Sequence, residues 1–74
     1  MSTTRDLKAI SYANYSKARD AKGLNNNQVA ELAKIPSSTI YDWAASRYMP
    51  KADKMLAIAK VLDVTVEMLM SEGE

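Results

Sequence analysis

The sequence predicts an all-α fold, and three of its features point to that class. Glycine is scarce, with two residues in a chain of 74. No segment alternates apolar and polar residues as a half-buried strand does, whereas several repeat apolar residues at helical spacing. A chain of this length forms one domain with a single small core. We therefore expect five short helices in one domain over residues 5–70.

The composition excludes several classes of function. The chain has no cysteine and no histidine, which removes zinc fingers, disulfide frameworks, thiol nucleophiles and imidazole acid–base chemistry. We expect no catalytic residue, no metal and no cofactor, and hence no enzyme. No apolar run is long enough for a membrane span or a signal peptide, so we expect a cytoplasmic protein with no membrane partner.

The charge is close to neutral. Ten basic residues face nine acidic ones, which gives a net charge of +1. Residues 71–74 form a short acidic tail, and without its Glu72 and Glu74 ten basic groups face seven acidic ones, or +3. A basic surface is the usual mark of a nucleic-acid binder, and here that mark is weak.

The first two expected helices are set by their ends. One covers residues 5–21 and stops at Gly23, a favourable residue just past a helix C-terminus. Its buried face is poorly defined. The next covers residues 26–34, after an N-cap supplied by one of three adjacent asparagines. Pro36 ends it, because the residue before a proline resists the α conformation. Its inward positions are Val29, Leu32 and Ala33.

A third helix is expected over residues 37–45. Ser37 is the preferred cap, and Ile40, Trp43 and Ala44 face inward. Two short helices joined by a tight turn, over about residues 26–45, are what a helix-turn-helix needs. In that motif the second helix enters the DNA major groove, and its first residues meet base edges. The outward polar residues that fit this task are Ser37, Ser38, Tyr41 and Asp42.

Two more helices are expected to close the core. Residues 51–62 carry the strongest amphipathic pattern, with Asp53 and Lys60 placed as the helix dipole favours. The inward positions there are Ala52, Met55, Leu56, Ala59 and Leu62, with Ile58 beside them. Residues 66–70 follow an N-cap at Thr65 and hold more apolar surface than one turn buries. A dimer contact is therefore an alternative to core packing for Met68, Leu69 and Met70; Leu7 and Ile10 form a second candidate patch.

Several motifs stand in a fixed order along the chain. They are KGLNNNQVAELAKIPSSTIYDW, then Pro50, MLAIAKVLDV and TVEML, from about Lys22 to Leu69. In this order and spacing they resemble the Cro/C1 (Xre) family of phage and bacterial repressors. The resemblance implies a five-helix, lambda-repressor-like fold and sequence-specific binding of double-stranded DNA, usually by a dimer.

By position, the resemblance also implies contacts to the DNA backbone. In the family the second helix is capped and meets phosphate at the positions of Asn25 and Asn26, with Asn27 beside them. The loop after the third helix contacts the backbone there, and in this chain it holds Arg47, Tyr48 and Lys51. The family's base-reading positions fall on Ser37, Ser38 and Asp42, with Tyr41 between them.

Four positions depart from the family pattern. Lys34 stands in the turn where the family favours Gly. A lysine is tolerable there if the backbone of that residue stays near the helical conformation. Pro36 replaces a common Ser or Thr cap. Ala44 replaces a Glu that pairs with an Arg of the first helix, so Arg19 needs another partner or faces solvent or phosphate. Asp42 brings a negative charge near phosphates, which is costly unless it accepts from a cytosine amino group.

Each assignment has a simpler alternative. The serines and asparagines can serve as helix caps, Tyr41 can cover the turn, and the charged residues can be solvated. Residues 25–50 hold two basic and two acidic groups, so the motif itself is neutral. A Cro-like or mobile-element repressor, acting as a dimer on a palindromic operator, is the leading expectation. The alternative is a protein-interaction module on the same scaffold, such as an antitoxin or anti-repressor.

Overall fold

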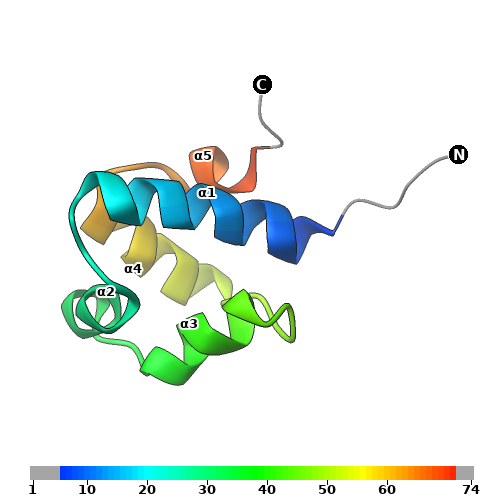
Figure 1. Cartoon of the computed structure of the whole chain (residues 1–74), viewed down its shortest axis with the longest axis horizontal. Helices are drawn as coiled ribbons and strands as arrows, with labels where there is room; N and C mark the ends of the chain where they lie inside the picture. The colour runs from blue at the N-terminus through cyan, green and yellow to red at the C-terminus, as the bar shows by residue number, and fades with distance from the viewer. Residues whose placement is uncertain (1–5, 72–74) are drawn as a thin grey trace, which may run out of the picture.

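The computed structural model describes residues 6–71, and these fold into five α-helices (Figure 1). The helices are α1 (Leu7–Ala21), α2 (Asn26–Ala33), α3 (Ser37–Ala44), α4 (Ala52–Leu62) and α5 (Val66–Met70). The all-α prediction is confirmed, and the bounds of the four later helices agree with the expected ones to within one residue. The expected start at Arg5 and the acidic residues Glu72 and Glu74 lie outside the described residues.

The five helices pack around one core. In Figure 1, α2 and α3 lie together at one side of the molecule and α5 lies at the other, with α1 and α4 between them. α1 contacts both α3 and α5, and α4 contacts both α2 and α5. The helix-turn-helix pair α2–α3 is therefore supported from behind by two longer helices. None of the helices within residues 6–71 has the length and apolar character needed to cross a membrane.

Trp43 joins α3 to α1 in the core. Its side chain is fully buried, and its ring lies 5.0 Å from Tyr15 and 5.6 Å from Tyr12. The indole Nε1 donates to Ser11 Oγ at 3.0 Å, so its polar atom is satisfied inside the protein. Burying a large apolar side chain contributes about 1.5–3 kcal/mol. The buried apolar residues are Tyr15, Val29, Ala30, Ile40, Trp43, Met55, Ile58, Ala59, Leu62 and Leu69.

Four apolar positions expected to face inward are exposed instead. Leu32 is 58% exposed and Leu56 is 48% exposed, and Ala44 and Ala52 also face solvent. Each residue turns a helix by about 100°, so the phase of the buried stripe decides which neighbours it includes. In α2 the small Ala30 packs inward, which moves the stripe away from Leu32. In α4 the buried positions are Met55, Ile58, Ala59 and Leu62, which form one face at the same spacing.

Four helices end in the same way. The chain turns through a left-handed residue, with φ of 69° at Gly23, 60° at Lys34, 59° at Ser46 and 59° at Asp63. The next residue then donates its N–H back into the last turn of the helix, as Ile35 does to the Ala30 carbonyl at 3.0 Å. This is the Schellman motif. The prediction for Gly23 is confirmed, whereas Lys34 does not stay near helical.

The N-termini are capped less uniformly. Asn25 and Thr65 cap α2 and α5 through their side chains, as the sequence predicts. The expectation that Ser37 caps α3 is wrong. Pro36 occupies the cap position without a side-chain hydrogen bond, and Ser37 is the first helical residue. The side chain of Ser37 is therefore not used in a cap and is exposed to solvent.

Candidate nucleic-acid interface

α3 has one buried face and one exposed face. Ile40 and Trp43 are fully buried, which fixes the helix against the core. Ser37, Ser38 and Tyr41 are exposed, and Asp42 is half-buried beside them. The four predicted base-reading residues therefore share the outer side of a helix whose orientation is set by packing. A rigid helix with small polar groups at its start has the shape that major-groove entry requires.

Tyr41 joins α3 to the start of α2. Its hydroxyl donates to Asn27 Oδ1 at 3.3 Å. Tyr41, which is predicted to read bases, thus contacts Asn27, which is predicted to contact the DNA backbone. The bond occupies the amide oxygen of Asn27 and leaves its NH₂ group available to donate. Tyr41 is 47% exposed as a residue, so it partly covers the turn while remaining accessible.

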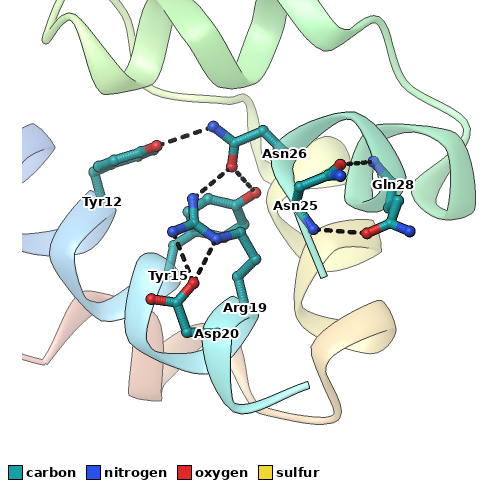
Figure 2. A network of polar contacts seen from close by, with 7 residues as sticks. All are labelled: Tyr12, Tyr15, Arg19, Asp20, Asn25, Asn26 and Gln28. Carbon is teal, nitrogen blue, oxygen red and sulfur yellow. Dashed lines mark hydrogen bonds and ion pairs between the residues drawn. The ribbon is translucent and has the colours of Figure 1, made fainter. Parts of the chain in front are cut away.

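Asn25 acts as the cap of α2. Its Oδ1 accepts from the Gln28 N–H at 2.8 Å, and Gln28 Oε1 accepts from the Asn25 N–H at 2.8 Å (Figure 2). This capping box satisfies two donors that a helix N-terminus otherwise leaves free. The side-chain oxygen of Asn25 is thus occupied, while the residue itself remains exposed.

Asn26 lies at the centre of a polar network that ties α2 to α1 (Figure 2). Its Oδ1 accepts from the Tyr15 hydroxyl at 2.6 Å and from Arg19 Nη1 at 2.8 Å. Its Nδ2 donates to the Tyr12 hydroxyl at 3.1 Å. The amide oxygen and one amide hydrogen of this predicted phosphate contact are therefore used inside the protein.

The same network supplies the partner of Arg19. Its guanidinium donates to Asn26 and to Asp20, with Arg19 Nη2 lying 2.9 Å from Asp20 Oδ1. Ala44, which replaces the family's glutamate, is exposed and takes no part. Burial lowers the pKa of Arg19, but the neighbouring Asp20 carboxylate and Tyr12 hydroxyl outweigh it and raise that pKa overall. Arg19 thus stays charged beside the first turn of α2.

Tyr15 is the most buried member of the network. Burial raises its pKa from 10.0 to about 12, with the positive charge of Arg19 opposing the rise. The hydroxyl is therefore protonated at any physiological pH and serves as a fixed donor to Asn26. This geometry orients the amide of Asn26 and hence the first residue of α2.

The loop after α3 carries the remaining predicted backbone contacts. Tyr48 is 69% exposed, and Lys51 is exposed at the N-terminus of α4. Arg47 is paired, since its Nη1 lies 3.1 Å from Asp42 Oδ1. A surface hollow of about 290 Å³ runs beside α3 into this loop. Its lining residues are Thr39, Asp42, Tyr48, Met49, Pro50, Lys51 and Lys54.

The three residues expected at a dimer contact lie differently. Met68 is 57% exposed, Leu69 is buried and Met70 is half-buried. Met68 borders a mainly apolar hollow of about 310 Å³ between α1 and α5. Leu7 of the second candidate patch is 40% exposed, and Ile10 is half-buried.

Sequence reasoning missed three polar residues of α1 that position the other helices. Ser11 accepts from Trp43, Tyr12 accepts from Asn26, and Asn14 Nδ2 donates to the carbonyl of Leu69 at 2.8 Å. Their partners are 14 to 55 residues away in the chain, so no local pattern indicates them. Among residues 6–71, no group of three or more acidic, histidine or cysteine side chains could hold a metal ion.

Comparison with known proteins agrees with this geometry. The family model described as Helix-turn-helix, HTH_3, matches residues 16–69, which is more than half of the chain. The chain therefore belongs to this Cro/C1-type helix-turn-helix family, and it is a DNA-binding helix-turn-helix regulator with the lambda-repressor-like all-α fold. Searches of curated proteins and of solved structures each found no match.

Proposed function

We propose that the protein is a sequence-specific transcriptional regulator, a Cro-like or mobile-element repressor that occupies a palindromic operator as a dimer. The observation that carries this proposal is the outer face of α3. Ile40 and Trp43 fix the helix against the core, while Ser37, Ser38 and Tyr41 are exposed on the side that would approach base edges. Serine hydroxyls donate and accept, and an aromatic ring suits contact with a thymine methyl group.

The backbone contacts of the proposal lie on both sides of α3. Asn27 offers its amide NH₂ at the start of α2, and Asn25 and Asn26 complete that helix end. Lys51 and Tyr48 offer exposed groups on the loop before α4. Phosphate contacts on two sides of a recognition helix fix its register in the groove without carrying sequence information.

The proposed dimer brings two copies of α3 to successive major grooves. Half-sites in such operators lie about one helical turn, or roughly 34–36 Å, apart. The exposed Met68, with the apolar hollow beside it, supports α5 as the dimer contact, together with the half-buried Met70; Leu69 is buried in the core and is not presented to a partner.

The test is selection of binding sites from random duplex DNA. The affinity of the enriched sequence is then measured at about 50 and 200 mM salt, a range over which several phosphate contacts weaken binding strongly. We expect an enriched palindrome with half-sites one turn apart. Failure to enrich any sequence, with only weak salt-sensitive binding, would contradict sequence-specific recognition.

One observation favours a second candidate, a protein-interaction module such as an antitoxin or anti-repressor. The helix-turn-helix is electrically neutral over residues 25–50, and the positive charge of Arg47 is paired with Asp42. This candidate predicts a stoichiometric protein partner that co-purifies with the chain. An antitoxin would bind DNA as well, so the partner discriminates this candidate from the first.

A further inference from the structure

The ion pair between Asp42 and Arg47 is built into the end of α3. The left-handed Ser46 brings the Arg47 N–H back to the Asp42 carbonyl at 2.9 Å. The same turn brings the two side chains together, with Arg47 Nη1 3.1 Å from Asp42 Oδ1. A Schellman end commonly has an apolar contact in this place. At the other three such ends among the described residues, the matching residues are Leu24, Ile35 and Val64, which pack against the core.

Both charges lie where they would affect DNA binding. Asp42 is on the outer side of α3 and also lines the hollow bordered by Lys51 and Lys54. The Arg47 side chain is 64% exposed, so it could reach a phosphate if it left Asp42. The carboxylate would then be unpaired near phosphates, which repel it. A cytosine amino group is the base donor that can replace the guanidinium as its partner.

We propose that Asp42 is a specificity-determining residue that acts through Arg47. On a duplex without a suitable base, the pair persists and Arg47 is withheld from the phosphates. A cytosine amino group opposite Asp42 takes the place of the guanidinium, and Arg47 is released to contact the backbone. This inference rests on the proposed function and deepens it, because it makes one backbone contact conditional on one base.

The experiment is a double-mutant cycle with Asp42→Asn, Arg47→Ala and both changes together. Each variant is titrated with the selected site and with an unrelated duplex over a range of salt concentrations. On the unrelated duplex, Arg47→Ala alone should remove no phosphate contact, because the guanidinium is already withheld; the unpaired Asp42 carboxylate should be the sole cause of any loss of affinity. Asp42→Asn should raise affinity for that duplex by about fivefold and steepen the salt slope by about one. Adding Arg47→Ala to Asp42→Asn should remove both gains.

On the selected site, Arg47→Ala should reduce the salt slope by about one even with Asp42 present. Asp63→Asn is the matched control, since it removes the same charge from an exposed aspartate at the far end of α4. It should leave the affinity difference between the two duplexes unchanged.

Two results would overturn the proposal. One is that Arg47→Ala weakens binding to the unrelated duplex by the same factor whether or not Asp42 is present. The other is that Asp42→Asn weakens binding to both duplexes alike. If the unaltered protein binds neither duplex at low salt, the proposed function itself fails and this inference fails with it. Thermal unfolding of each variant confirms that the comparison is between folded proteins.

Discussion

Asn26 shows how one small polar residue can hold two helices together. Its amide group joins Tyr12, Tyr15 and Arg19 of α1 to the first turn of α2. The sequence identifies Asn26 as a residue at a helix start and leaves the partner of Arg19 open. It could not reveal the network, because an amide that faces inward and one that faces DNA look the same in a sequence. Only the packing of α1 against α3 brings these side chains within reach.

Replacing Tyr15 with phenylalanine should change how stability depends on pH. The pKa of Tyr15 is raised to about 12, so the neutral hydroxyl is favoured in the folded state. This contribution is complete below pH 10 and is lost as the pH rises from about 10 towards 12, by at most roughly 2–3 kcal/mol. Tyr15→Phe should cost about 1 kcal/mol at neutral pH through the lost hydrogen bond. Above pH 10, the Tyr15→Phe variant should lose less stability than the unaltered protein, because it lacks the hydroxyl that titrates.

Chemical denaturation at a series of pH values measures this difference. Tyr48→Phe is the control, because that side chain is exposed and makes no hydrogen bond to any other residue among 6–71. An alkaline loss of stability that is as steep in Tyr15→Phe as in the unaltered protein would show that other groups cause it.

At the scale of the elements, the ends of the helices differ in how well the sequence predicts their conformation. Gly23 is readily predicted at a left-handed position, because glycine has no Cβ to clash there. Lys34, Ser46 and Asp63 adopt the same conformation without that signal. The helices themselves were predictable from apolar spacing, but the facing of α2 and α4 was not. Leu32 is exposed because the small Ala30 completes the buried stripe of α2, and Leu56 is exposed because the buried face of α4 passes through Met55 and Ile58 instead.

The turn between α2 and α3 should be strained at Lys34. A left-handed conformation costs a residue with a Cβ about 1–2 kcal/mol, part of which glycine recovers. Lys34→Gly should therefore stabilise the protein by about 0.5–1 kcal/mol. Lys22→Gly is the matched control, since Lys22 has a right-handed φ of −92° and gains nothing from glycine. The free energy of unfolding of both variants tests this, and equal destabilisation by the two changes would refute it.

At the scale of the whole molecule, the all-α fold and the helix-turn-helix followed from the order and spacing of the motifs. The arrangement of the predicted site could be judged only after folding. Ser37, Ser38 and Tyr41 share an outer face, whereas Asn26 faces α1 and Asp42 faces Arg47. The surplus apolar surface of α5 was visible in the sequence, and Met68 is the residue that remains exposed.

If α5 forms the dimer contact, Met68→Lys should separate the two copies. The new charge would lie beside Lys17 at the edge of the apolar hollow and would need to be desolvated in the dimer. Leu56→Lys is the control, because Leu56 is similarly exposed but lies on α4. Sedimentation velocity should show a monomer for Met68→Lys and a dimer for Leu56→Lys. A dimer that persists in Met68→Lys would place the contact elsewhere.

The most direct test of the central claim measures the affinity of three variants for a panel of single-base changes in the selected site. Each variant is compared with the unaltered protein. Ser38→Ala should relax the preference at one base pair by about 1–3 kcal/mol. Lys51→Ala should weaken every duplex alike and reduce the salt slope by about one, and Lys60→Ala at the other end of α4 should change little. If Lys51→Ala changes the base preference, or Ser38→Ala weakens all duplexes equally, then α3 does not read bases as proposed.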